Sequence, residues 1–283
     1  MSNISGGAGP CQDVIVSARP LLRWAGSKRQ LLPLLVEYWS EAFERYIEPF
    51  CGSSALYFRL RPDSAILSDS NRELIHFYEV VRRDPVRIWT ETLAVARTKE
   101  EYLRQRALVP ETMSERRRAV RFLFLNRHCF NGLYRTDRFG HFNVPFSGTK
   151  TGDLPSLDDF LSVASLLKRA RLRCCDFGHT LKLAGRGDFV YLDPPFFVSS
   201  RRIFRDYGPR RFAAADITRL ARHLDSLDSR GARFVMSFAE CSEIQDLRRN
   251  WISRRVRVRR QIAGFAADRR QASEYLITNI ASG

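Results

Sequence analysis

Long apolar runs, lysine and paired cysteines are all scarce in this chain of 283 residues. No apolar run approaches the roughly 20 residues of a membrane-spanning helix, and the N-terminus lacks the apolar core of a signal peptide. The small and polar residues of segment 1–18 predict a flexible leader. These absences exclude an integral membrane protein and predict a cytoplasmic one.

The six cysteines do not form a C-x-x-C pair, and no histidine lies at metal-ligand spacing from them. A disulfide framework and a metal centre are therefore not expected. No internal repeat is present either. The sequence predicts no metal site.

Basic residues outnumber acidic residues 47 to 31, giving a formal net charge of +16, and only five of the 47 are lysine. Such a charge predicts a polyanionic partner, and the arginine fork suits phosphate oxygens. A genome-wide preference for arginine would produce the same count. The charge therefore favours nucleic acid as a partner without proving it.

Strand and helix patterns alternate in two blocks that flank a helical, charged stretch, which predicts one α/β sheet with an inserted lobe. The expected domains are 19–76 with 151–283, and 77–150 between them. Strands are expected at 45–50, 64–69, 171–177, 188–193, 232–238, 254–260 and 274–280. Helices are expected at 31–43, 55–61, after a cap at Asn71, at 213–228 and at 241–250.

The turn Glu48-Pro49-Phe50-Cys51-Gly52-Ser53-Ser54 joins a strand to a helix, as in nucleotide-binding βαβ units. It lacks the G-x-G-x-x-G spacing, so a dinucleotide is not favoured. Asp69 lies 17 residues after Gly52 at the end of the next strand, where a carboxylate can accept both ribose hydroxyls. Each feature alone is weak, but together they favour an adenosine-bearing ligand. A loop from Trp24 to Lys28 adds one ammonium group.

The segment 187–192 is an apolar strand that leads into Asp193-Pro194-Pro195-Phe196. Neither proline can donate to a sheet, and the residue before a proline is held extended. An acid, a carbonyl and a flat ring in a stiff loop suit the binding of a planar amine. A Pro-Pro turn with a buried Phe is the alternative interpretation.

Six motifs in order resemble the Dam-type (D12 class) DNA adenine-N6 methyltransferases over about residues 20–280. They are Arg23-Trp24-Ala25-Gly26-Ser27-Lys28, Ile47-Glu48-Pro49-Phe50-x-Gly52, Ser68-Asp69-x-Asn71, Asn126-Arg127-x-x-Phe130-Asn131-Gly132-Leu133-x-Arg135, Phe142-Asn143-Val144-Pro145-Phe146 and Asp193-Pro194-Pro195-Phe196. The resemblance implies a Rossmann-like S-adenosylmethionine-dependent methyltransferase sheet with an inserted helical DNA-recognition lobe and a hairpin at about 126–146.

The resemblance also implies roles. Asp193 and the Pro194 carbonyl would accept the N6 hydrogens of an adenine flipped out of double-stranded DNA, with Pro195 and a stacking Phe196 beside them. S-adenosylmethionine would lie against Trp24, Lys28, Glu48, Pro49, Phe50, Gly52, Ser53, Ser54, Asp69, Asp176, Phe177 and Asp193. No obligate protein partner is implied.

For DNA, the resemblance implies that Phe130 wedges between base steps, Arg135 reads a guanine, and Leu133 and Pro145 touch thymine methyls. The match suggests the site GATC. The remaining expected DNA-binding residues are Arg23, Asn126, Arg127, Asn131, Arg201 and Arg205. If Asn131 and Phe130 instead form an ordinary turn and core, these roles fall away.

Three departures from the family pattern stand out: Ser53 and Ser54 replace glycines, Phe196 replaces tyrosine, and arginines such as Arg201 replace hydroxyl residues. The arginines of strand 254–260 fit a solvated edge or a DNA contact equally well. Alternative functions are methylation of another planar amine, in RNA or on a protein glutamine, and DNA binding by a catalytically inactive regulator.

Overall fold

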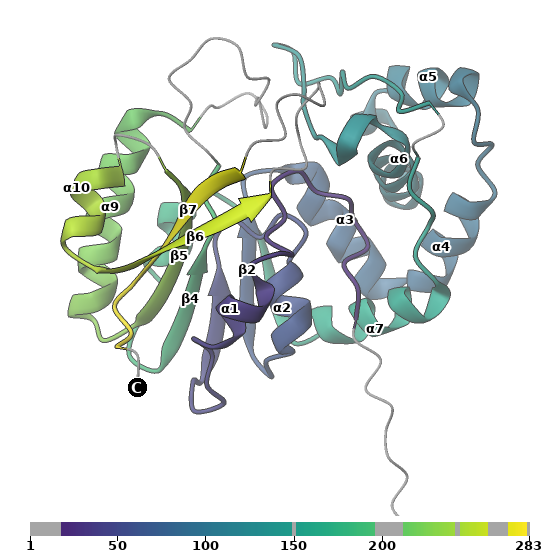
Figure 1. Cartoon of the computed structure of the whole chain (residues 1–283). Coiled ribbons are helices and arrows are strands. Elements are labelled where there is room, and N and C mark those ends of the chain that lie inside the picture. The colour runs from purple at the N-terminus through teal and green to yellow at the C-terminus, as the bar shows by residue number, and fades with distance from the viewer. Residues whose placement is uncertain (1–17, 149–150, 196–211, 241–243, 260–270, 282–283) are drawn as a thin grey trace, which may run out of the picture.

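A computed structural model describes residues 18–148, 151–195, 212–240, 244–259 and 271–281. In this part of the chain, one seven-stranded sheet lies between layers of helices (Figure 1). The strands are β1 (Arg45–Glu48), β2 (Ala65–Asp69), β3 (Ala170–Cys174), β4 (Asp188–Leu192), β5 (Arg233–Ala239), β6 (Ile252–Arg259) and β7 (Gln271–Thr278). The expected α/β class is confirmed.

The strand order is β3-β2-β1-β4-β5-β7-β6. The first five strands in this order run parallel, and β7 lies antiparallel between β5 and β6. The chain moves outward from β1 to β3 and then returns to β4, so the order reverses between β1 and β4. Open α/β sheets bind ligands outside the carboxyl ends of the strands at such a reversal. Glu48 ends β1 and Asp193 follows β4, so the two motifs meet there.

Helices cover both faces of the sheet because alternate strand residues point to opposite sides. Tyr46 lies in the core under α1, α2 and α3, whereas its neighbour Ile47 lies in the core under α8, α9 and α10. The helices are α1 (Leu32–Val36), α2 (Ala55–Leu60), α3 (Arg72–Arg83), α4 (Pro85–Leu93), α5 (Lys99–Ala107), α6 (Glu115–His128), α7 (Leu157–Leu167), α8 (Phe177–Leu181), α9 (Ala214–Ser229) and α10 (Ile244–Arg249). Among the described residues, no helix is long and apolar enough to cross a bilayer.

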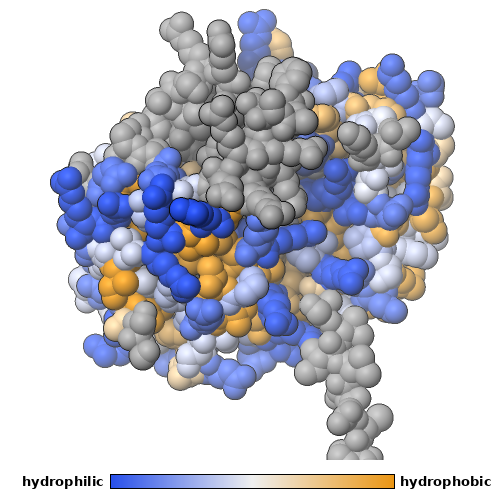
Figure 2. Space-filling model, viewed as in Figure 1, coloured by the Kyte–Doolittle hydropathy of each residue, from blue (hydrophilic) through white to orange (hydrophobic). Residues whose placement is uncertain are grey.

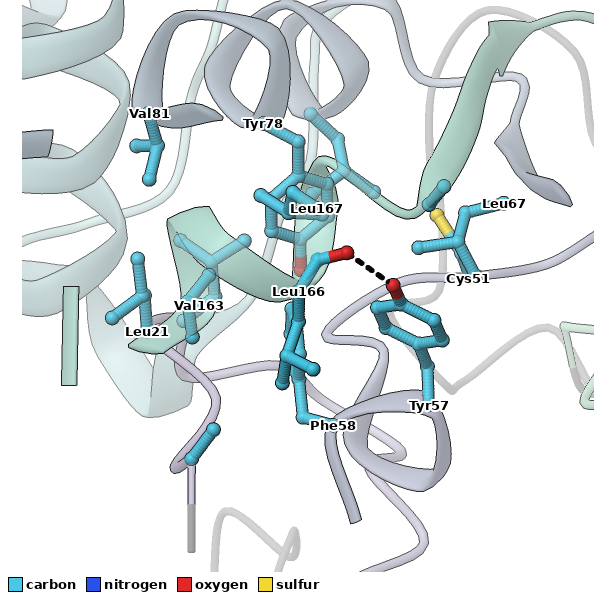
Figure 3. Close-up of a cluster of buried hydrophobic side chains, with 14 of the residues drawn as sticks. Leu21, Cys51, Tyr57, Phe58, Leu67, Tyr78, Val81, Val163, Leu166 and Leu167 are labelled. Carbon is cyan, nitrogen blue, oxygen red and sulfur yellow. Dashed lines mark hydrogen bonds between the residues drawn. The ribbon is translucent and has the colours of Figure 1, made fainter. Parts of the chain in front are cut away.

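Helices α3 to α7 and loop 129–148 lie between β2 and β3 in the chain and form what is called here the recognition lobe (Figure 1). The lobe shares the core of the sheet. Val81 of α3 and Val163 of α7 point into the same apolar cluster as Leu67 of β2 (Figure 3). The Tyr57 hydroxyl donates to the Leu166 carbonyl at 2.5 Å, which ties α2 to the end of α7. The expected boundaries at 77 and 150 stay predictions.

Two expectations about helices were wrong. The helix expected over 31–43 ends at Val36, because the rings of Trp39 and Phe43 leave the helix to pack on Phe189 of β4, with centroids 5.5 and 5.3 Å away. Helix α7 was not expected, although Ser156 begins it with a capping box.

The expected hairpin is irregular. Loop 129–148 has only two isolated antiparallel bridges, Cys129 with Phe146 and Thr136 with Phe142, and a short turn at Phe130–Gly132. The two sides of the loop therefore face each other without a regular ladder.

Candidate active site

The turn after β1 is built around close packing. Gly52 has a φ of 44°, and an added Cβ would lie 2.7 Å from Nε1 of Trp24, so this position needs glycine. Ser54 has a φ of 50°, in the left-handed region that glycine would occupy without strain. Both serines that replace family glycines, Ser53 and Ser54, are buried. Pro49 is buried as well.

Acidic side chains end the first two strands. Glu48 is buried and its carboxylate accepts a hydrogen bond from the Tyr46 hydroxyl at 3.0 Å, while burial raises its pKa well above the usual value. Asp69 accepts hydrogen bonds from the backbone N–H groups of Gly52 at 3.1 Å and Asn71 at 2.9 Å. Burial raises the pKa of Asp69 to about 6, although these backbone donors lower it. Asp69 therefore lies directly against the glycine turn, as the sequence indicated.

An aromatic surface continues from this turn to α8. Phe50 and Phe177 have ring centroids 5.1 Å apart. Asp176 caps α8 by accepting from the Gly178 N–H at 2.9 Å. Arg219 of α9 pairs with Asp176 at 2.7 Å and lies 4.1 Å above the Phe177 ring. The sequence interpretation missed Arg219, because nothing in a surface helix pattern marks a contact with a distant turn.

Asp193 follows β4 and has a dense set of partners. Lys28 Nζ lies 2.8 Å from Asp193 Oδ1, and Ser237 Oγ donates to the same oxygen at 3.1 Å. The side chain of Asp193 is 20% exposed, against 8% for Lys28. Burial raises the pKa of Asp193, while Lys28 and Ser237 lower it. The carboxylate is therefore held in place by groups from two segments.

Lys28 was expected to bind the cofactor, but in the structure its ammonium group contacts Asp193. Its ammonium also donates to the Gly26 carbonyl at 3.1 Å and lies 3.9 Å from Glu274 of β7. A role toward the cofactor stays a prediction. Ser237 and Glu274 were missed, although each is a polar residue facing inward from a sheet strand.

The remaining catalytic motif is only partly described. Pro194 is buried and Pro195 is half-buried. Phe196, Arg201 and Arg205 lie outside the described residues.

Several residues expected to bind DNA join the recognition lobe to the N-terminal segment. The Asn126 amide accepts from the Arg23 N–H at 2.9 Å and donates to the Arg23 carbonyl at 2.6 Å. Arg23 donates to the Arg127 carbonyl at 3.0 Å, and Arg127 donates to the backbone of Leu21 and Asp153. Asn126 is 4% exposed, so its amide is used inside the protein. A DNA contact by Asn126 or Arg127 is left as a prediction without support from this placement.

The first residues of loop 129–148, beside its bridge from Cys129 to Phe146, have a different character. Phe130 is 40% exposed and its N–H donates to the carbonyl of the exposed Pro145 at 2.9 Å. Asn131 has a φ of 53° and forms the turn, and Leu133 is half-buried. Arg135 donates through Nε to Asn143 Oδ1 at 2.6 Å, which fixes the plane of its guanidinium.

Two arginines of β6 form ion pairs with acidic residues of the protein itself. Arg255 pairs with Glu240 at 2.8 Å, and Arg254 lies 3.6 Å from Glu37. Figure 2 shows hydrophilic side chains beside an apolar area on the face that carries β6 and α1. These ion pairs favour the interpretation of β6 as a solvated edge strand.

A mixed sheet whose strand order reverses between the parallel strands β1 and β4, with an acid at the carboxyl end of each, defines a Rossmann-like methyltransferase fold. Residues 24–261 match the family model of the D12 class N6 adenine-specific DNA methyltransferase. The chain belongs to this family, and it is an adenine-specific DNA methyltransferase.

Named relatives agree with this family. The chain is 31% identical to the type II methyltransferase M1.LlaDCHI of Lactococcus lactis subsp. cremoris, over 93% of this chain and 96% of the relative. It is 30% identical to the Retron Ec67 DNA adenine methylase of Escherichia coli, over 90% of each chain. It is 29% identical to a DNA adenine methylase of Vibrio cholerae, over 91% of this chain and 95% of the relative.

Proposed function

We propose that this enzyme transfers a methyl group from S-adenosylmethionine to N6 of an adenine flipped out of double-stranded DNA, within GATC. The observation that carries the proposal is the half-buried Asp193 carboxylate, held by Lys28 at 2.8 Å at the carboxyl end of β4. An adenine N6 cannot be reached while the base is stacked, so the base must leave the helix first.

The turn residues fit a nucleoside. Asp69 retains acceptor capacity beyond its two backbone donors, which suits ribose hydroxyls. Phe50 and Phe177 provide an apolar surface beside the Asp176 carboxylate, which suits an adenine ring. When bound there, S-adenosylmethionine supplies an electrophilic methyl group on a sulfonium.

Asp193 and the Pro194 carbonyl would each accept one N6 hydrogen. The amine lone pair is delocalised into the ring, and two acceptors on one side favour the tetrahedral nitrogen that can attack. Oriented acceptors in a partly buried site need little reorganisation during the reaction. The proton leaves after the nitrogen has become cationic.

Asp193→Ala tests the proposal. We expect methyl transfer to a GATC duplex to be lost, because the amine loses its acceptor, while DNA affinity stays within a few-fold. Tritium transfer and fluorescence anisotropy measure the two effects. Robust turnover by this variant would refute the role of Asp193.

Modified-base sequencing of DNA from cells that express the enzyme tests substrate and site together. We expect N6-methyladenine at GATC. Modification at another sequence would reject GATC alone. Transfer to RNA or to protein glutamine without DNA modification would reject DNA as the substrate.

A further inference from the structure

Asp193 has a lateral neighbour on β5 that no motif marks. Leu192 pairs with Met236 in the parallel register, so the next residues, Asp193 and Ser237, lie level with each other. Ser237 is fully buried, and its hydroxyl donates to Asp193 Oδ1 at 3.1 Å. The contact is therefore built into the sheet and does not depend on a surface loop.

The Ser237 hydroxyl has a fixed direction. Its oxygen lies 3.0 Å from the buried hydroxyl of Tyr191, and either oxygen could be the donor on distance alone. Serine has one proton, and the carboxylate takes it. Tyr191 must then donate to Ser237, which gives a chain from Tyr191 through Ser237 to Asp193. Donors in such a chain polarise and strengthen each other.

The two carboxylate oxygens of Asp193 differ in their hydrogen-bond partners. Oδ1 receives both Lys28 and Ser237, which fills its two lone-pair directions. Among the described residues, Oδ2 has no hydrogen-bond partner. Two donors on one oxygen resist rotation of the carboxylate about its bond to Cβ, so Oδ2 keeps one direction.

We propose that Ser237, oriented by Tyr191, is a positioning residue that presents Asp193 Oδ2 to the target amine. This inference rests on the proposed function. Four titratable groups face the carboxylate from the packed elements: Lys28, Glu48 on β1, Tyr191 on β4 and, through Lys28, Glu274 on β7. None of these four groups lies on β5, so none could donate the hydrogen bond that Ser237 gives to Oδ1.

The test compares Ser237→Ala and Tyr191→Phe with the wild-type enzyme. With Oδ1 held by Lys28 alone, the carboxylate can rotate, and we expect kcat of Ser237→Ala to fall at least about tenfold. KM for duplex DNA and Kd for S-adenosylmethionine should stay within about twofold, because Ser237 is fully buried behind Asp193. Tyr191→Phe should lower kcat less than Ser237→Ala does. Ser237→Thr, which keeps the hydroxyl, should retain most of the wild-type kcat.

A pH profile separates positioning from a general loss of stability. Ser237 lowers the pKa of Asp193, so its removal should move the acidic limb of kcat to higher pH. Thr278→Val is the matched control. It removes another buried hydroxyl, which donates a hydrogen bond to the Phe234 carbonyl of β5 at 2.6 Å. It should leave kcat and the acidic limb unchanged.

The inference is overturned if Ser237→Ala keeps wild-type kcat and pH profile, or if Ser237→Thr fails to recover activity while binding both ligands normally. If Ser237→Ala does not fold, the inference is overturned when Tyr191→Phe keeps wild-type kcat or when Ser237→Thr loses activity while binding both ligands normally. Asp193→Ala is measured in parallel. Activity in that variant would reject the proposed function, whereas an inactive Asp193→Ala beside a normal Ser237→Ala would reject only the positioning role.

Discussion

At the scale of single residues, three carboxylates end neighbouring strands and each meets a different set of donors. Glu48 receives the Tyr46 hydroxyl, Asp69 receives backbone N–H groups, and Asp193 receives Lys28 and Ser237. Burial raises the pKa of all three. Charged groups tolerate burial only when partners offset the lost hydration. The donors therefore offset part of the rise in pKa that burial causes at each of these acids.

The raised pKa of Asp69 predicts that cofactor binding depends on pH. Its pKa is raised from 3.8 to about 6, so its carboxylate becomes protonated as the pH falls through about 6. The protonated form loses acceptor capacity for ribose hydroxyls, and S-adenosylmethionine affinity should drop below that pH and level off above it. Isothermal titration across pH 5 to 8 measures the effect. Asp69→Asn should bind more weakly and show a flat profile, and an equally steep profile in that variant would assign the titration to another group.

Arg135 predicts a change in sequence preference. Arg135→Ala should relax discrimination at one guanine by about 1–3 kcal/mol, because a bidentate base contact is lost. Asn143→Ala, which removes the bond to Arg135 Nε but keeps the bond from Arg135 to the backbone carbonyl of residue 143, should lose part of the same discrimination. Methylation of duplexes with single substitutions in GATC measures both. Arg138→Ala in the same loop is the control, and discrimination that is unchanged in Arg135→Ala would exclude Arg135 as the reader.

At the scale of elements, the recognition lobe is attached through backbone contacts. Asn126 near the end of α6 bonds both polar groups of Arg23, and Gly132 packs so closely that an added Cβ would lie 2.8 Å from the Arg23 carbonyl oxygen. Arg23 and Trp24 are therefore fixed relative to loop 129–148. The predicted DNA-reading segment and the active-site segment share one rigid joint.

Asn126→Ala should cost about 1–3 kcal/mol of unfolding free energy, because it removes the two hydrogen bonds between the buried amide and the backbone of Arg23. Urea denaturation measures the loss. Asp63→Ala is the control, since its ion pair with Arg169 is exposed and should contribute about 1 kcal/mol or less. Equal stability of Asn126→Ala and the wild type would show that water replaces the amide at this joint.

The sequence predicted the positions of the sheet strands, because apolar residues with a turn signal mark most of them, but the strand expected at 171–177 ends at Cys174, and Phe177 begins α8. It overextended α1, since 3–4 spacing also arises where Trp39 and Phe43 pack on Phe189 from an irregular segment. It missed α7 although Ser156 and Asp159 form a recognisable capping box.

Within the candidate site, sequence motifs indicated Asp69 and Asp193 but not the contacts that hold their carboxylates. The contact of Ser237 with Asp193 depends on the register between β4 and β5, and a single sequence does not fix that register. The contact of Arg219 with Asp176 likewise depends on how α9 packs beside α8. Contacts made across strands and helices require the assembled fold.

At the scale of the whole molecule, the net charge of +16 should govern DNA affinity. Each phosphate contact releases counterions, so we expect log K for DNA to fall linearly with log salt and affinity to drop at least about tenfold between about 50 and 200 mM salt. Affinity for S-adenosylmethionine should change by less than about twofold. Anisotropy with a labelled duplex measures the slope, and DNA binding that is insensitive to salt would contradict a phosphate-based interface.

The insertion point of the recognition lobe has an evolutionary consequence. Strands β2 and β3 are paired parallel neighbours, so the chain leaves the sheet at Asp69, at the carboxyl end of β2, and re-enters it on the adjacent strand at Ala170, level with Ala65. A different lobe could be exchanged between these points without reordering any strand, provided that α3 and α7 travel with it to keep the shared apolar core intact. Under the prediction that loop 129–148 reads the DNA, transplanting one contiguous stretch of gene would change the target sequence and leave the catalytic residues as they are.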